Sequence, residues 1–319
     1  MRDLGPGIEA LQGGVVAVGN FDGVHRGHQS VIATTIDRAR ALGRPAAVLT
    51  MEPHPRSYFQ AQPLFRLTPV ACKLRLLAST GLDGVVVLTF DAALAALTAE
   101  DFASRILVDR LKVKGVVIGF DFHFGQGRVG SPEFLKEKGA QSGFSVDIVP
   151  PLAEAGRPVS SGAIRADLEA GRVEDAATLL GYPWFVSGSV IHGEKRGRDL
   201  GFPTANVRLD PSCALRHGIY AVRVGLEGKL YEGVASFGRR PTFDNGAPLL
   251  EIFLFDFSGS LYDRALDVAF IGWIRPEMKF DSIADLVTQM DKDSALAREA
   301  LAHAPAAFPQ LGPLPHPAA

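Results

Sequence analysis

The feature that most limits the possible folds is a regular alternation of two hydrophobic patterns in the first 150 residues. Short apolar runs at residues 15–18, 46–49, 85–88 and 116–118 are bounded by glycine or charged residues, as is typical of strands buried on both faces. Between them lie amphipathic stretches with apolar residues at helical spacing, such as residues 29–42. This alternation predicts an α/β fold with a doubly wound parallel sheet.

The hydrophobic pattern changes in the second half of the chain. After a last helical pattern at residues 161–180 come short apolar segments, which are separated by glycine, proline and Asn-Gly. Many short strands with turn signals predict a small antiparallel β-barrel. The strands are expected at residues 185–192, 218–226, 229–237, 249–257 and 266–271, and a closing helix at residues 282–301.

We therefore predict two domains and a tail. The parallel-sheet domain spans residues 1–182 and the barrel domain spans residues 183–302. An alanine- and proline-rich tail at residues 303–319 is expected to be disordered. The length of 319 residues suits two domains of roughly 150 residues each.

The composition excludes several classes of function. A net charge of −2 leaves no electrostatic footprint for nucleic acid or an anionic membrane, so we expect neither as a partner. No stretch approaches the roughly 18 apolar residues of a membrane span, and no signal peptide is visible. The two cysteines, Cys72 and Cys213, suit neither a disulfide framework nor a zinc site. We expect a cytoplasmic protein, and the sequence does not indicate its oligomeric state.

A glycine-rich turn joins the first predicted strand to the first helix. Its backbone N–H groups and the helix N-terminus favour an anion such as a phosphate. His25 and His28 are three apart, so both can donate hydrogen bonds to phosphate oxygens as charge builds. Glycine turns and single histidines are common without such a role, and no Walker A lysine follows. The candidate ATP-binding residues here are Gly19, Asn20, Phe21, Asp22, Gly23 and Gly27.

The string from Gly19 to His28 resembles the HxGH signature of nucleotidylyltransferases. With Phe-Asp-Gly-Val-His in this form, it is similar to the bifunctional riboflavin kinase/FMN adenylyltransferase family, and the resemblance continues at residues 52–56 and 119–125. It covers residues 13 to about 302. It implies that His25 and His28 contact ATP phosphates and that residues 119–125 lie near FMN. The candidate flavin-binding residues there are Asp121, Phe122, Phe124 and Gly125, although alternating phenylalanines also suit one face of an ordinary strand.

The second motif of the superfamily departs from its usual form. The usual Ser-Ser-Thr-x-x-Arg is here Ser160-Ser161-Gly162-Ala163-Ile164-Arg165. Ser160, Ser161 and Arg165 are candidates for phosphate binding, while either serine could instead cap a helix. The hydroxyl missing at Gly162 removes one hydrogen bond worth about 0.5–1.5 kcal/mol, so we expect adenylyl transfer to be slower by roughly tenfold.

A second dense string lies at residues 192–206. Its basic, glycine-containing part suits a loop over phosphates, with Gly193, Lys195, Arg196 and Gly197 as candidate ATP-binding residues. Thr204 and Asn206 are two apart, so an extended chain presents both on one side as oxygen ligands for Mg²⁺. A polar surface strand with a charged hairpin is the alternative. The string resembles the flavokinase signature with its Gly-Phe-Pro-Thr-Ala-Asn core, which implies a small antiparallel barrel.

Glu251 is the candidate catalytic base of the second domain. It shares a strand face with Phe253 and Phe255, where a carboxylate is costly unless it is paired or used. An edge-strand glutamate near solvent is the alternative. The resemblance to flavokinases implies that this glutamate accepts the proton of the riboflavin 5′-hydroxyl. It also implies that Arg275, in the segment 275–280, lies over the flavin.

The sequence thus predicts a bifunctional enzyme of flavin cofactor synthesis. The barrel domain would phosphorylate riboflavin with Mg²⁺ and ATP, and the N-terminal domain would join FMN to AMP from ATP with release of pyrophosphate. In the alternative, only the kinase is active and the N-terminal domain is a regulatory module that binds nucleotide or flavin. Gly162 favours that alternative, while the intact His25 and His28 favour two activities. A flavin storage protein would leave Glu251 and the magnesium ligands unexplained.

Overall fold

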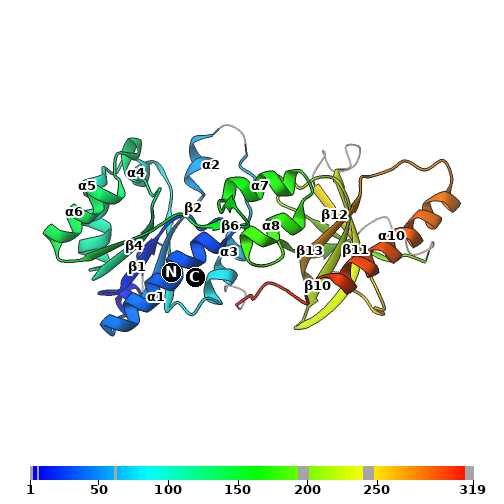
Figure 1. Ribbon diagram of the computed structural model, residues 1–319, viewed down its shortest axis with the longest axis horizontal. Helices are drawn as coiled ribbons and strands as arrows, with labels where there is room; N and C mark the ends of the chain where they lie inside the picture. The colour runs from blue at the N-terminus through cyan, green and yellow to red at the C-terminus, as the bar shows by residue number, and fades with distance from the viewer. Residues whose placement is uncertain (1–2, 6, 61–62, 193–200, 240–247, 313–319) are drawn as a thin grey trace. The chain divides into compact units, whose positions relative to one another are not determined.

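The chain folds into two compact units in the computed structural model, which describes residues 3–5, 7–60, 63–192, 201–239 and 248–312 (Figure 1). Unit 1 comprises Met1–Leu64, Thr68–Ser160 and Gln310–Ala319. Unit 2 comprises Phe65–Leu67 and Ser161–Pro309. Each unit therefore includes one short segment that is distant in sequence from the rest of it. No helix within the described ranges has both the length and the apolar character needed to cross a bilayer.

Unit 1 is built on a five-stranded parallel sheet with the order β3-β2-β1-β4-β5, which confirms the predicted fold. From β1 the chain moves outwards to β2 and β3, and it then places β4 and β5 on the other side of β1. The switch point of this doubly wound order lies between β1 and β4. The strands are β1 Val15–Val18, β2 Ala46–Glu52, β3 Gly84–Thr89, β4 Gly115–Gly119 and β5 Ser145–Val149.

Helices connect these strands, and α1 packs on β1, β2 and β4 (Figure 1). The helical pattern predicted from residue 29 begins earlier, at Arg26, because the side chain of His25 caps the helix. The longer helices are α1 Arg26–Leu42, α3 Val70–Ala78, the π-helix η2 Phe102–Arg110 and α6 Pro132–Ser142. The short elements are η1 Ile8–Leu11, α2 Pro55–Phe59, α4 Ala92–Ala95, α5 Ala99–Asp101, η3 Gln126–Arg128, β6 Ala153–Glu154 and β7 Arg157–Pro158.

Unit 2 is a closed antiparallel barrel with the strand order β10-β11-β12-β9-β8-β13, as the sequence predicts. The closing helix α10 packs on β10, β11 and β13. The strands are β8 Phe185–Ile191, β9 Thr204–Arg208, β10 Gly218–Leu226, β11 Lys229–Arg239, β12 Pro248–Leu254 and β13 Ala265–Arg275, and the helices are α7 Ser161–Glu169, α8 Val173–Leu180 and α10 Ile283–His303.

The two units divide at residues 160 and 161, whereas the sequence placed the domain boundary at 182 and 183. The difference arises because α8 packs on β13 of the barrel. The segment 65–67 also belongs to unit 2, where Trp184 donates its indole N–H to the carbonyl of Leu67 at 2.9 Å. Arg165 donates from Nε to the carbonyl of Phe65 at 2.6 Å. These polar contacts cannot be read from hydrophobic periodicity.

The sequence predicts a disordered tail from residue 303, but residues within 303–312 make defined contacts in the structure. The buried Arg223 of β10 donates from Nη2 to the carbonyls of Leu301 and Ala304 at 3.0 and 3.3 Å. Its Nη1 atom donates to the carbonyl of Pro305. One guanidinium thereby satisfies carbonyls at the end of α10 that the helix leaves without partners. In unit 1, Gly312 donates its N–H to the carbonyl of Arg75 on α3 at 2.9 Å.

We expect Arg223→Met to destabilise unit 2 by about 2–4 kcal/mol, because several carbonyls lose a charged donor. Both tryptophans of the chain, Trp184 and Trp273, belong to unit 2, so denaturant unfolding followed by tryptophan fluorescence reports on this unit. The matched control is Arg264→Met, which removes an exposed ion pair with Glu227 and should change stability by less than about 1 kcal/mol. Equal midpoints for the two variants would contradict the assigned role.

Candidate active sites

The glycine-rich turn of unit 1 lies at the carboxyl end of β1, next to the switch point of the sheet. Ligands of doubly wound sheets bind at this place, because the strand order leaves a crevice there. The turn leads directly into α1, so the helix N-terminus faces the same region and favours an anion. The fold therefore places the glycine-rich turn at a position that favours an anion.

The two histidines of the turn stack on each other at the N-terminus of α1. The ring centroids of His25 and His28 are 3.6 Å apart, with an interplanar angle of 16°. Nδ1 of His25 accepts the backbone N–H of His28 at 3.3 Å. That bond leaves the proton of a neutral His25 ring on Nε2, where it can be donated to an anion. A Cβ at Gly27 would lie 3.2 Å from Nδ1 of His25, so a larger residue would crowd this ring.

His28 is held in its neutral form. Burial of the ring keeps the pKa of His28 well below the ordinary histidine value of 6.5. Coulombic interactions with His25, Lys73 and His54 lower that pKa further. Part of His28 stays exposed, but its Nδ1 atom is buried and, like Oδ1 of Asn20, has no hydrogen-bond partner within the described part of the chain. Such buried polar atoms are uncommon in native proteins and are groups that a bound ligand would satisfy.

Phe21 and Asp22 anchor the turn through buried contacts. Oδ1 of Asp22, which is 2% exposed, accepts the backbone N–H of Thr68 at 3.0 Å and its hydroxyl at 3.3 Å. Gly23 donates its N–H to Oγ1 of Thr68 at 2.9 Å. The buried ring of Phe21 lies 5.2 Å from that of His28. Asp22 and Gly23, which the sequence groups with the ATP-binding residues, are thus bonded to Thr68 outside the turn and hold the turn in place.

A buried ion pair next to the turn was missed by sequence reasoning. The side chain of Lys73 on α3 is 1% exposed, and its Nζ lies 2.5 Å from Oε1 of Glu52 at the end of β2. A sequence signal does exist, because Lys73 shares a helical face with Val70 and Leu77. A lysine on an apolar helix face must be paired if that face is buried.

Residues 119–125 form a loop after β4 rather than a continued strand, because β4 ends at Gly119. The alternative interpretation of Phe120, Phe122 and Phe124 as one strand face is therefore wrong. Phe120 is 51% exposed, whereas Phe124 is 7% exposed and its ring stacks 5.4 Å from that of Phe122. Gly125 has φ 73° and lies against the backbone of residue 99, so it shapes the loop. The exposed members of this loop are Phe120, Asp121 and His123.

Three aromatic rings cluster at the carboxyl ends of β2 and β3. Tyr58 and Phe59 of α2 lie edge-on to Phe90, with ring centroids 5.4 and 5.8 Å apart. Tyr58 is 43% exposed and Phe59 is 68% exposed, which is high for such large rings. Exposed rings at the ligand-binding edge of the sheet suit a planar aromatic ligand. The adjacent Tyr58 and Phe59 are a sequence signal for this cluster, although no motif in the sequence analysis includes them.

The second motif lies at the start of α7, which begins at Ser161. Ser160 belongs to unit 1, whereas Ser161 and Arg165 belong to unit 2. Arg165 is 9% exposed, and its Nε is engaged by the carbonyl of Phe65. Gly162 is exposed.

The barrel brings Thr204, Asn206 and Glu251 to one face of neighbouring strands. In the antiparallel pairing of β9 and β12, Asn206 lies directly opposite Glu251, and Thr204 lies opposite Phe253. Directly paired residues project from the same face, so an amide, a hydroxyl and a carboxylate gather there. Asn206 is 8% exposed, and Glu251 is partly buried. The predicted phosphate loop with Gly193, Lys195, Arg196 and Gly197 lies outside the described residues.

Arg275, which the sequence assigns to the flavin site, makes a bidentate ion pair in unit 2. Its Nε and Nη2 donate to the two carboxylate oxygens of Asp293 on α10 at 2.7 and 2.6 Å. Gln289 donates to the same carboxylate at 2.9 Å. The described contacts of Arg275 therefore join the end of β13 to the closing helix.

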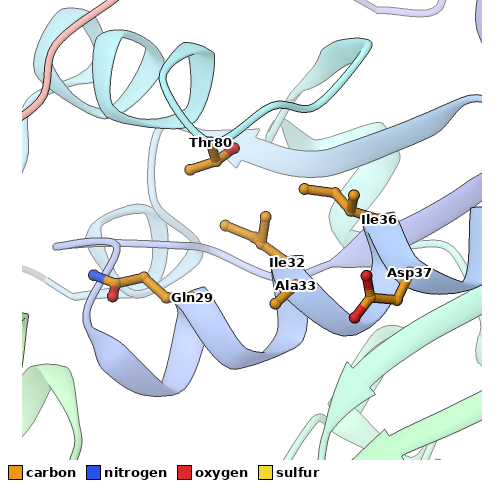
Figure 2. Close-up of a pocket in the computed structure, with 6 residues that line it drawn as sticks. All are labelled: Gln29, Ile32, Ala33, Ile36, Asp37 and Thr80. Carbon is orange, nitrogen blue, oxygen red and sulfur yellow. The ribbon is translucent and has the colours of Figure 1, made fainter. Parts of the chain in front are cut away.

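A cavity of ≈ 290 Å³ lies along α1, starting one residue after His28 (Figure 2). Figure 2 shows Ile32 and Ile36 projecting from α1 towards Thr80. The lining of this cavity is largely apolar, and Asp37 is the single ionisable residue among the lining residues. The cavity lacks convergent polar groups, so it is not a site for phosphate chemistry. It is lined by Gln29, Ile32, Ala33, Ile36, Asp37 and Thr80.

Comparisons with known proteins agree over both halves of the chain. Residues 8–163 match the family described as FAD synthetase, and residues 180–301 match riboflavin kinase. The bifunctional riboflavin kinase/FMN adenylyltransferase of Pseudomonas fluorescens is 42% identical over 288 residues, which cover 90% of this chain and 93% of that protein. The proteins of the same name from Escherichia coli strain K12 and Bacillus subtilis strain 168 are 40% and 37% identical, and the matches cover 90% and 88% of this chain and 93% and 90% of theirs.

A solved structure shares the fold over most of the chain. It is described as a macrolide-efflux protein from Streptococcus pneumoniae, and it superposes with a TM-score of 0.81 at 33% identity. The match covers 90% of this chain and 94% of that one.

We expect acid to destabilise unit 1 through His28. Between about pH 6.5 and the lowered pKa of folded His28, the unfolded chain binds a proton that the folded chain does not, so stability falls as the pH drops through that window. His28→Asn should make the pH dependence shallower, and the exposed control His303→Asn should not. The measurement is thermal unfolding by far-UV circular dichroism from pH 8 to 5. Tryptophan fluorescence, recorded in parallel, identifies the unfolding of unit 2, so the remaining transition is assigned to unit 1. Parallel curves for wild type and His28→Asn would contradict the assignment.

Proposed function

The chain belongs to the family of bifunctional riboflavin kinases/FMN adenylyltransferases, and from this premise we propose how its residues divide the two reactions. The enzyme phosphorylates riboflavin to FMN with ATP and then adenylylates FMN to FAD with release of pyrophosphate. We assign adenylyl transfer to the site at the glycine-rich turn of unit 1, and phosphorylation to the barrel of unit 2. The observation that carries the assignment is the stacked pair of His25 and His28 at the helix N-terminus beside the switch point of the parallel sheet.

In adenylyl transfer, a phosphate oxygen of FMN attacks the α-phosphorus of ATP and the bond to the pyrophosphate group breaks. The attacking group is already an anion, so the step needs no general base. The enzyme has to orient the two anions and stabilise the charge that moves to pyrophosphate. Neutral His28 and Nε2–H of His25 can donate to phosphate oxygens, and the N-terminus of α1 adds positive potential.

Several residues support a flavin site in the same unit. The exposed rings of Tyr58 and Phe59, with Phe90 beside them, suit contact with a planar isoalloxazine ring. The exposed Asp121 and the partly exposed Phe122 of the loop after β4 remain candidates. Both groups of residues follow the carboxyl ends of sheet strands, where ligands of this fold bind.

In phosphoryl transfer, the 5′-hydroxyl of riboflavin attacks the γ-phosphorus of ATP, the bond to the bridging oxygen breaks, and ADP leaves. Glu251 accepts the hydroxyl proton. The oxygen atoms of Thr204 and Asn206 suit Mg²⁺, because both are hard ligands on the strand face that carries Glu251. When bound, Mg²⁺ would neutralise phosphate charge. The pairing of Asn206 with Glu251 would keep the base and the phosphate site adjacent. Arg275 stays a candidate for contact with the flavin, and its ion pair with Asp293 would fix its guanidinium at the end of β13.

A kinase with a regulatory N-terminal domain is not favoured, because family models and curated relatives match both halves of the chain. The partners we propose are riboflavin, FMN and ATP, with Mg²⁺. We also propose a cytoplasmic location, in keeping with the buried thiols of Cys72 and Cys213 and with the use of ATP.

Variants of one residue in each site should separate the two reactions. We expect His28→Ala to lower FAD formation from supplied FMN by about 100-fold or more, because a transition-state donor is lost. It should leave FMN formation unchanged. Glu251→Gln should lower FMN formation by about 100-fold or more, because the base is lost, and should leave FAD formation from FMN intact. The measurement is chromatography of the flavins made with Mg²⁺ and ATP.

The controls His303→Ala and Glu227→Gln change exposed residues of the same kinds. Both should make FMN and FAD at the wild-type rate. Loss of both products in His28→Ala would contradict the division of labour, and so would normal FMN formation by Glu251→Gln.

Restoring the hydroxyl of the second motif should speed adenylyl transfer. Gly162 is exposed in the first turn of α7, so a threonine can be placed there. We expect Gly162→Thr to raise the rate of FAD formation by up to about tenfold, which is the value of one hydrogen bond. The rate of FMN formation serves as the internal control. An unchanged rate of FAD formation would mean that the motif does not act at this position.

A further inference from the structure

We propose that Lys73 is a positioning residue for adenylyl transfer, because its buried ammonium group fixes the backbone carbonyl of Asn20 and with it the turn that carries His25 and His28. The inference rests on the proposed assignment of adenylyl transfer to unit 1. Lys73 lies on α3, outside the turn and outside the motifs recognised in the sequence.

The contacts of Lys73 form a tripod. Nζ lies 2.5 Å from Oε1 of Glu52, 3.1 Å from Oγ1 of Thr50 and 3.2 Å from the carbonyl oxygen of Asn20. An ammonium group has three N–H donors, so each of these acceptors can receive one. Three directed bonds fix the position of Nζ, and the side chain has no room to move because it is 1% exposed.

Thr50 closes a ring of hydrogen bonds with the same carbonyl. Its hydroxyl accepts from Lys73 and donates to the carbonyl oxygen of Asn20 at 3.1 Å. That oxygen thus receives two donors, one for each lone pair. The peptide group after Asn20 is therefore held from β2 and from α3 at the same time, at the point where the chain leaves β1.

The anchored peptide leads directly to the reactive groups. Phe21 follows Asn20, and its ring lies 5.2 Å from that of His28. The charge of Lys73 is also felt at His28, where it helps to lower the pKa of the imidazole. The orphaned Oδ1 of Asn20 belongs to the same residue whose carbonyl Lys73 holds. A shift of this peptide would move the phosphate donors, and a displacement of about 1 Å can cost about 100-fold in rate.

Stability alone does not account for a charged pair at this place. Removing two charges from water costs free energy, and replacing a buried ion pair by apolar groups of similar volume is often neutral or stabilising. A methionine in place of Lys73 would fill the same space but would offer no donor to Asn20. The fold and the position of the turn can therefore be separated by experiment.

The test compares Glu52→Gln with the double variant Glu52→Gln/Lys73→Met. The single variant keeps the donors of Lys73, so we expect FAD formation within about threefold of wild type. The double variant is uncharged at both positions, so it should melt no lower than the single variant, in which the buried Lys73 has lost its carboxylate partner. Its kcat for FAD formation from supplied FMN should fall by about 30- to 100-fold with little change in KM, while FMN formation stays normal.

Two results would overturn the proposal. One is a double variant that keeps the kcat of the single variant, and the other is a single variant that loses as much activity as the double. If the double variant does not fold, Thr50→Val provides the test, since it removes one of the two donors to Asn20 and should lower kcat by about five- to tenfold. The control is Thr34→Val, which removes a hydroxyl that donates to the carbonyl of Ser30 within α1. This control should leave kcat unchanged.

His28→Ala is measured in parallel to keep the two levels of inference apart. If His28→Ala loses FAD formation and the double variant does not, the role of Lys73 is rejected while the site assignment stands. If His28→Ala keeps FAD formation, the site assignment itself fails.

Discussion

The site in unit 1 depends on the central strand β1, which is buried and paired with a neighbouring strand on each side. β1 is at most 2% exposed along its length, and it pairs in register with β2 on one side and with β4 on the other. Its last residue therefore delivers the chain to a fixed point at the carboxyl edge of the sheet, where the doubly wound order leaves a crevice. The residues that follow are then held from a second direction, because Thr68 bonds Asp22 and Gly23 while Lys73 bonds Asn20. Rigidity of this kind matters for a reaction that consists mostly of bringing two anions together.

Much of this unit could be predicted from the sequence, because its signals are local. The apolar runs give the strands, and the spacing of His25 and His28 within one turn gives their proximity. The supports of the turn could not be predicted in the same way. Lys73 is 53 residues from Asn20 in sequence, and Thr68 is 46 residues from Asp22. Only the packing of α3 brings them together. Asp22 illustrates the consequence, since its motif suggests ligand binding while its carboxylate also accepts hydrogen bonds from the distant Thr68.

The barrel shows the same division between local and distant information. That Thr204 and Asn206 share a side follows from the period of a strand, but the pairing of Asn206 with Glu251 requires the register between β9 and β12. Arg275 shows the limit of motif reasoning, because Asp293 on a helix that follows it takes up its guanidinium. The boundary of the domains was also hidden, because helical periodicity does not reveal that α8 packs on β13. Contacts with main-chain carbonyls, such as those of Arg223, leave no trace in a hydrophobic pattern.

The exchange of short segments between the two units bears on how the chain is made. Unit 1 includes residues 310–312, in which Gly312 bonds the carbonyl of Arg75, and unit 2 includes residues 65–67, in which Leu67 accepts from Trp184. A growing chain that has released only its first half lacks the Gly312 N–H that bonds α3, and a fragment that begins at Ser161 lacks the acceptor of the Trp184 indole. Neither half is therefore a complete unit of folding when taken as a continuous piece.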